Sequence, residues 1–94
     1  MIASREDGDS YIIDFCDLED WNGFERIFDL LSEKFIVEIR NKIDGPESRI
    51  WHFDMDGVPV SLHNNPYGNY LKGASAESVD YLKGVIDKIR FIFY

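Results

Sequence analysis

The sequence is poor in the residues that carry most enzyme and metal chemistry. Its 94 residues include one cysteine, Cys16, two histidines and three prolines, so an intrachain disulfide is impossible. It contains no C-x-x-C pair, no G-x-S-x-G turn and no glycine-rich phosphate loop. No apolar run approaches the ~18 residues of a membrane-spanning helix, and the polar start MIASREDGDS is unlike a signal peptide. These absences predict a cytoplasmic protein that is not an enzyme and has no cofactor.

Basic residues are also scarce. Ten lysines and arginines face 18 acids, which gives a net charge of −8. Residues 1–33 hold ten of the acids and two bases, Arg5 and Arg26, whereas residues 34–94 hold eight of each. An acidic surface repels phosphate and disfavours nucleic-acid binding. It favours a basic protein partner, and the alternative is a solvated surface that keeps the protein soluble.

The segment from Arg49 to His63 predicts a β-hairpin turning on Asp56-Gly57, because both central residues of a type I′ turn need a positive φ. Pairing the strands about this turn puts six apolar side chains on one face: Trp51, Phe53, Met55, Val58, Val60 and Leu62. The other face carries Ile50, His52, Asp54, Pro59, Ser61 and His63. One apolar and one mostly polar face fix the register.

Further strands are expected at residues 11–15, 35–43 and 69–72, the last at an edge of the sheet. Tyr11, Ile13 and Phe15 would face the core. In residues 35–43, one face would hold Phe35, Val37, Ile39 and Ile43, and the other Ile36, Glu38, Arg40 and Lys42.

Two helices are expected from apolar residues spaced three and four apart. The first follows the N-cap Asp17 and runs to about Glu33, with the apolar stripe Trp21, Phe24, Ile27, Phe28 and Leu31. The second follows the N-cap Ser75, with the stripe Val79, Leu82, Val85, Ile86 and Ile89. The apolar residues 91–94 are expected to dock against the protein.

The predicted order is β-α-β-β-β-β-α in a single domain spanning residues 1–94, with residues 1–9 as a flexible lead-in. The predicted fold is an α+β two-layer sandwich, in which two helices cover one face of an antiparallel meander of four or five strands. The other face of the sheet stays open.

Three features invite a chemical interpretation. His52, Asp54 and His63 share the predicted open face, and two imidazoles with a carboxylate suit zinc or acid–base work. Asp54-Met55-Asp56-Gly57 is like the start of a calcium loop, but the following residues supply no further oxygen ligands. Cys16 is interpreted as a small core residue, because neighbouring acids oppose a thiolate. Trp21 and Trp51 are interpreted as core residues, with interface anchors as the alternative.

The pattern of Trp21, Phe24, Trp51 and Phe53, together with size and acidity, resembles small bacterial domains of unknown function and the immunity proteins that neutralise a cognate toxin. The resemblance implies a binding protein and transfers no residue role.

The first functional hypothesis is therefore a cytosolic protein-binding module, in the form of an immunity protein for a basic toxin. Its expected contacts are Asp17, Glu19, Asp20, Glu25 and Asp29. A second is a homo-oligomer formed through the open sheet face (Ile36, Ile50, Pro59) or an edge strand containing Tyr70. A third is a small metal protein or enzyme using His52, Asp54 and His63.

Overall fold

The computed structural model describes residues 2–16, 18, 21–66 and 68–93, without the side chain of Trp21. The fold is α+β. In chain order the elements are β1 (Ile2–Asp7), β2 (Ser10–Phe15), α1 (Trp21–Lys34), β3 (Val37–Asp44), β4 (Arg49–Met55), β5 (Val58–Asn65), β6 (Gly68–Gly73) and α2 (Ala76–Ile92). Among these, no helix is long and apolar enough to cross a membrane.

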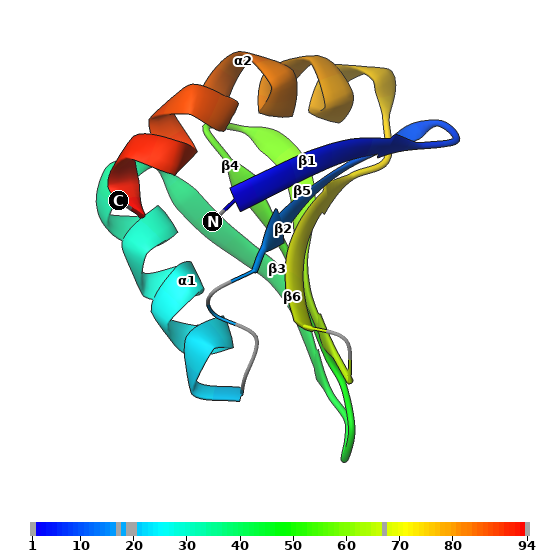
Figure 1. Ribbon diagram of the computed structural model, residues 1–94, viewed down its shortest axis with the longest axis vertical. Coiled ribbons are helices and arrows are strands. Elements are labelled where there is room, and N and C mark those ends of the chain that lie inside the picture. Colours follow the sequence, from blue (N-terminus) through cyan, green and yellow to red (C-terminus); the bar gives the residue numbers. More distant parts are fainter. Residues whose placement is uncertain (1, 17, 19–20, 67, 94) are drawn as a thin grey trace.

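The sheet has six antiparallel strands in the order β1-β2-β6-β5-β4-β3, and both helices lie against one of its faces (Figure 1). Two expectations were wrong. Residues 2–7, which we placed before the sheet, form the edge strand β1 and pair with β2 from Ile2–Phe15 to Asp7–Ser10. β6, which we placed at an edge, pairs with β5 on one side and β2 on the other. Because β2 pairs with β6, the strands are not neighbours in chain order throughout, as they would be in the predicted meander. With β1 added beside β2, the sheet is wider than expected.

The predicted β4–β5 hairpin is confirmed in its register. Met55 pairs with Val58, Phe53 with Val60 and Trp51 with Leu62. The turn residues Asp56 and Gly57 have φ of 52° and 82°, which is the left-handed conformation that a type I′ turn requires.

A β-bulge in β3 changes which face its second half presents. The register with β4 shifts between Ile39 and Asn41, so Lys42 pairs with Trp51 on the helix side, and Ile43 pairs with Ile50 on the open side. Our assignment of Ile43 to the core face and Lys42 to the other face was therefore wrong. One extra residue inverts the alternation downstream of it.

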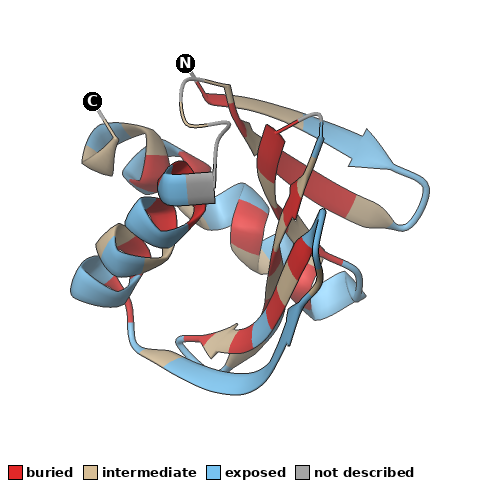
Figure 2. Cartoon of the chain, turned by 90° about the horizontal axis from the view of Figure 1, so that it is seen from below, coloured by how far each residue is buried: buried red, intermediate tan, exposed pale blue. Residues whose placement is uncertain are grey.

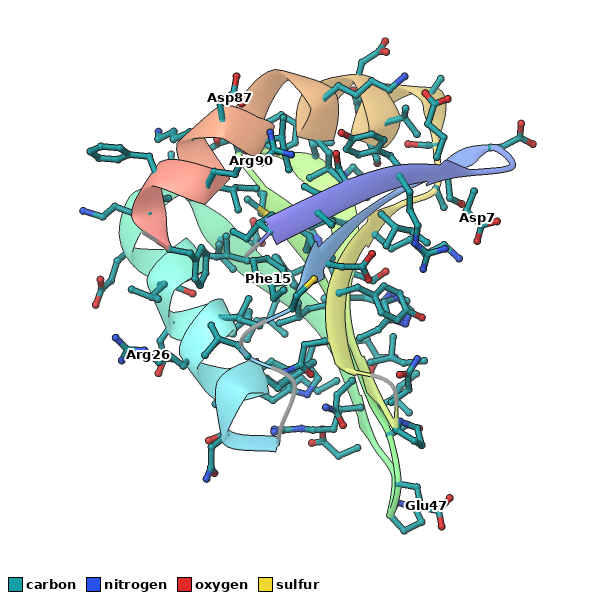
Figure 3. The ribbon with its side chains drawn as sticks, viewed as in Figure 1. Asp7, Phe15, Arg26, Glu47, Asp87 and Arg90 are labelled. Atoms are coloured by element: carbon teal, nitrogen blue, oxygen red, sulfur yellow. The ribbon has the colours of Figure 1, made fainter. Side chains whose placement is uncertain are left out.

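The core lies between the helices and the sheet, where buried positions alternate along the strands (Figure 2). From α1, Phe24, Ile27 and Leu31 are fully buried, as the predicted stripe requires. Tyr11, Ile13 and Phe15 of β2 are also buried as expected, and Phe15 lies between the sheet and the helices in Figure 3.

The second helix packs very closely on the sheet at Gly73. A Cβ at this position would lie 2.9 Å from side-chain atoms of both Ser78 and Leu82, so only glycine allows the approach. The hydroxyl of the buried Ser78 donates to the carbonyl of Pro59 and anchors α2 to β5. These contacts fix α2 over β5 and β6 and leave the opposite face of these strands uncovered.

The ends of the helices agree in part with expectation. Ser75 is the N-cap of α2, and its side chain accepts a hydrogen bond from the Ser78 N–H. Asp17, the expected N-cap of α1, lies outside the described residues. At the other end of α2, Phe93 packs against Phe15 with ring centroids 5.0 Å apart, whereas Phe91 is 84% exposed. Docking of the apolar end is thus confirmed for Phe93 and wrong for Phe91.

Candidate functional site

The N-terminal end of α1 and the end of β3 together form an acidic patch built on a buried arginine. Arg49 Nε donates to Asp44 Oδ1 at 3.0 Å, and Arg49 Nη2 donates to Glu25 Oε1 at 3.3 Å. The Arg49 side chain is 6% exposed, whereas those of Asp44 and Glu25 are 49% and 57% exposed. The Arg49 cation is therefore hidden, and the two carboxylates are the exposed ends of its ion pairs.

Aromatic rings hold that arginine in place. The Arg49 guanidinium lies 4.6 Å from the ring centroids of both Phe24 and Trp51. Trp51 meets Phe24 and Phe28 edge to face, and its Nε1 donates to Asp44 Oδ1 at 2.8 Å. Hydrogen bonds from Trp51 and then from Arg49 hold the pKa of Asp44 below its usual value. Trp51 is a core residue, as predicted, and it keeps Asp44 ionised and oriented.

Of the other predicted contact acids, Asp29 is the one that the described residues include. Asp29 is exposed on α1, one turn further along from Glu25. Asp17, Glu19 and Asp20 lie outside the described residues. Glu47, on the turn between β3 and β4, projects outward in Figure 3.

Most of the bases are engaged within the molecule. Arg5 pairs with Asp14 at 3.2 Å, Arg40 Nε donates to Asp54 at 2.9 Å, Lys83 pairs with Glu6, and Arg90 pairs with Asp87 at 3.4 Å. Lys42 and Lys88 lie over the rings of Trp51 and Phe35, at 4.0 and 4.8 Å from the centroids. The net charge of −8 arises because the acids outnumber these bases.

The open face of the sheet differs from the acidic patch in its balance of charges. Among the residues that the structure describes, register and contact place three bases and four acids on this face: Arg5, Arg40, Lys72, Asp7, Asp14, Glu38 and Asp54. A row of apolar and aromatic side chains crosses it from β3 to β6, pairing Ile43 with Ile50, Ile50 with His63, and His63 with Tyr70. This face is nearly neutral, in contrast to the whole protein at −8.

The structure does not assemble the predicted metal triad. His52 and His63 share the open face as predicted, but the Asp54 carboxylate is bound to Arg40. Across the described residues, no group of three or more His, Cys, Asp and Glu side chains is arranged to hold a metal ion. His63 instead stacks on Tyr70, with centroids 4.7 Å apart and planes 6° from parallel.

His63 also has a nucleophile-like neighbour. Its Nε2 lies 2.7 Å from the Ser61 Oγ, the geometry of a serine with a general base. Burial, with smaller effects from Lys72 and His52, lowers the pKa of His63 to about 4, which makes the imidazole a weak base. Within the described residues no carboxylate orients the other ring nitrogen. The hydrogen bond between Ser61 and the neutral His63 is therefore suited to fixing these two side chains in place.

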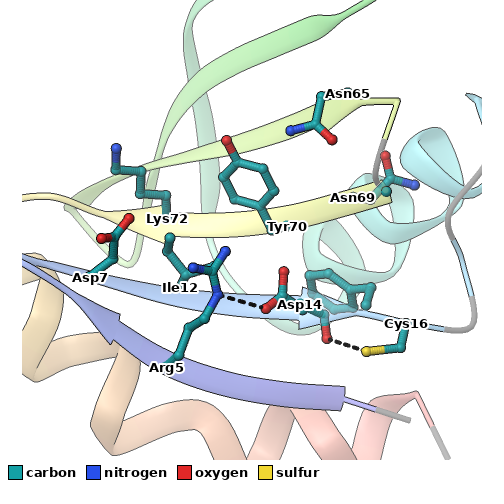
Figure 4. Close-up of a pocket in the computed structure, with 11 residues that line it drawn as sticks. Arg5, Asp7, Ile12, Asp14, Cys16, Asn65, Asn69, Tyr70 and Lys72 are labelled. Carbon is teal, nitrogen blue, oxygen red and sulfur yellow. Dashed lines mark hydrogen bonds and ion pairs between the residues drawn. The ribbon is translucent and has the colours of Figure 1, made fainter.

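A hollow of about 490 Å³ opens on this face beside β1, β2 and β6 (Figure 4). The Arg5–Asp14 pair crosses it, and Tyr70, Lys72 and Cys16 line it. Cys16 is half-buried at its end, and its thiol lies 4.0 Å from the Asp14 carbonyl, a weak hydrogen bond. The interpretation of Cys16 as a core residue was therefore wrong: the thiol lines a surface hollow.

The calcium-like sequence is used for structure. Asp56 accepts from the Ile36 N–H at 3.0 Å and from the Tyr81 hydroxyl at 2.7 Å, and its own N–H donates to the Ile36 carbonyl at 2.8 Å. The bond from Tyr81, then that from Ile36, lowers the pKa of Asp56. This carboxylate ties the β4–β5 turn to the start of β3 and to α2.

Sequence reasoning included Glu25 but missed Arg49 and Asp44, and it missed the hollow for a different reason. Arg49 is the first residue of the predicted hairpin and lies two positions before Trp51. Because side chains alternate along a strand, both residues are on the apolar face, and this was the signal for a buried cation. The hollow needs β1, and the turn between Asp7 and Ser10 is Gly8-Asp9, a two-residue hairpin signal with glycine first. Gly8 has φ of +61°.

No family model, curated protein or solved structure matches this chain. The likeness to immunity proteins therefore stays a prediction. The acidic patch and the open face are the features of the molecule that indicate a function.

Proposed function

We propose that this is a cytosolic binding protein for a basic protein partner, and that the partner contacts the acidic patch of Glu25 and Asp44. The contact extends along α1 to Asp29 and along the chain before α1 to Asp17, Glu19 and Asp20. An immunity protein that neutralises a basic toxin is the form of this function that the resemblance implies.

One observation carries the proposal. Glu25 and Asp44 are about half exposed but fixed on the almost fully buried Arg49. Fixed carboxylates lose less side-chain entropy on binding than free ones, so they bind a cation at lower cost. The depressed pKa of Asp44 keeps it charged down to acidic pH.

Arg49 and Lys42 offset much of the charge of Glu25 and Asp44. The net negative charge of the proposed contact therefore comes from Asp29 and from the predicted contacts Asp17, Glu19 and Asp20. Arg26 is exposed on α1 and points away from the sheet in Figure 3. Electrostatic steering of a basic partner is expected to raise the association rate and to weaken as salt is added.

The test is capture from the native cell's lysate with immobilised protein at 50 and 300 mM NaCl. The test variant Glu19→Lys/Asp29→Lys reverses two predicted contacts. The control Asp9→Lys/Glu77→Lys makes the same charge change at exposed positions elsewhere. We expect wild type and control to capture the same basic protein, and the test variant to lose it at least about tenfold.

Glu25→Gln provides a finer test, because the amide oxygen still accepts from Arg49 while the charge is lost. We expect it to slow association with the purified partner and to leave the fold intact. Capture that is insensitive to salt and unchanged by Glu19→Lys/Asp29→Lys would refute the proposal.

A further inference from the structure

The uncovered face of the sheet has the composition of a contact surface. Four half-buried or exposed side chains, Ile43, Ile50, His63 and Tyr70, form a continuous row across β3, β4, β5 and β6. Ile43 is 50% exposed. A row of this kind is expected to gain from burial against another surface.

The charges of this face indicate which surface fits it. Its three bases and four acids sum to −1, against −8 for the chain, and the Arg5–Asp14 and Arg40–Asp54 pairs already neutralise four of these groups. A basic partner is drawn to the acidic patch and gains little here. Two copies of this chain repel through every strongly acidic surface, and the open face is where that repulsion is smallest.

The sheet edges are poor alternatives for self-association. β3 carries a bulge between Ile39 and Asn41 and alternating charges at Glu38, Arg40 and Lys42. Bulges and charged side chains are features that prevent strand addition at an edge. At the other edge, Glu6 of β1 is tied to Lys83 of α2.

The available area sets the strength of the contact. Six strands with a spacing of ~4.8 Å are about 24 Å across, and strands of about seven residues are ~23 Å long, which gives roughly 550 Å² per copy. Two copies would bury roughly 1,100 Å², just below the range of stable interfaces. An interface of this size is typical of weak or transient complexes.

We propose that the open face docks on the same face of a second copy, giving a weak symmetric dimer with the helices on the outside. This surface is separate from the acidic patch. The two contacts respond to salt in opposite ways, because salt screens the repulsion between two −8 chains and strengthens the dimer.

Sedimentation equilibrium from 10 μM to 1 mM, at 50 and 500 mM NaCl, tests the proposal. We expect the average mass of the wild type to rise toward the dimer with concentration, and more so at high salt. Ile43→Asp should raise Kd at least about tenfold. Phe91→Asp, the same kind of change at an exposed apolar side chain on α2, should leave Kd within about twofold of wild type.

An NMR dilution series on the wild type gives a second readout that needs no variant. Amide shifts should move with concentration in β4, β5 and β6 and stay constant on the outer side of α1. Monomeric mass up to 1 mM at both salt concentrations would overturn the proposal and leave the face bare or reserved for a different protein. Equal weakening by Ile43→Asp and Phe91→Asp, or shifts confined to the helices, would also overturn it.

Discussion

Arg49 and Arg40 lie on neighbouring strands, and each holds two carboxylates, but they face opposite sides of the sheet. Arg49 is covered by α1 and lies between the rings of Phe24 and Trp51. Arg40 lies on the open face with its side chain 58% exposed, bound to Asp54 and 3.6 Å from Glu38. The same ion-pair chemistry thus occurs in two environments that differ mainly in access to water.

The difference shows that the two arginines serve different purposes. On the helix side, the arginine is a structural element, because its stem and guanidinium fill space between aromatic rings. On the open side, the ion pairs chiefly remove net charge from a surface, since exposed pairs contribute little stability. Charges largely cancel on the open face, whereas the acidic patch lies on the helix side of the sheet. This difference distinguishes the two proposed contact surfaces.

The largest expected effect is at Arg49. Arg49→Ala should lower the free energy of unfolding by about 2–4 kcal/mol, because it empties the space between two rings. Arg40→Ala should cost about 1 kcal/mol or less. Urea unfolding of both variants measures the difference.

Arg49→Met is the informative control, because it keeps an apolar stem between the rings without the charge. It should recover roughly half of the loss caused by Arg49→Ala. Equal costs for Arg49→Ala and Arg40→Ala would show that the two faces are not distinct in the way described.

A smaller effect is expected from pH, through His63 on the open face. Its pKa is about 4 in the folded protein, below the ordinary value of 6.5, so the unfolded chain takes up a proton first as pH falls. Stability from the neutral imidazole is therefore full above pH 6.5 and lost between about 6.5 and 4. We expect the free energy of unfolding to fall by about 1–2 kcal/mol from pH 7 to 5, a figure that already allows for the partial exposure of His63.

The groups around His63 separate this effect from others. Lys72 and His52 both oppose its protonation, and Tyr70 and Ser61 contact the ring. His63→Phe keeps a ring against Tyr70 and should flatten the pH dependence of urea unfolding between pH 7 and 5. The carboxylates with depressed pKa values, such as Asp44 and Asp56, lose their contribution only at lower pH. An unchanged slope in His63→Phe would contradict this assignment.

The smallest expected effect tests the bulge in β3. Ile43→Thr should change the free energy of unfolding by no more than about 0.5 kcal/mol, because this side chain is on the open face. The matched change Val60→Thr puts a hydroxyl into the core and should cost about 1–2 kcal/mol. Thermal melts of the two variants compare them, and a similar cost for both would place Ile43 back in the core.

Local patterns predicted the elements that are organised over short distances. The alternation about Asp56-Gly57 gave the β4–β5 register correctly, and the three- and four-residue spacing of Phe24, Ile27 and Leu31 gave the buried side of α1. These features depend on neighbours in the chain, which periodicity records.

Features that depend on distant partners were not predictable in this way. β1 has no apolar alternation, and its place in the sheet follows from pairing with β2, which in turn pairs with β6. The bulge at Arg40 leaves no mark in the pattern of β3. For the candidate site, acidity was readable from composition, but Asp44 became part of it only through the buried Arg49.

The β2–β6 pairing also has a consequence for the order of folding. It joins Tyr11 to Gly73 and Asp14 to Tyr70, so two segments that lie far apart in the chain must meet before these strands can pair. Such long-range closure is entropically costly and slow compared with local hairpins. An isolated two-stranded hairpin is marginally stable in water. During synthesis, β1 and β2 leave the ribosome before β6 and have to wait for it, so strands made early are among the last to be secured.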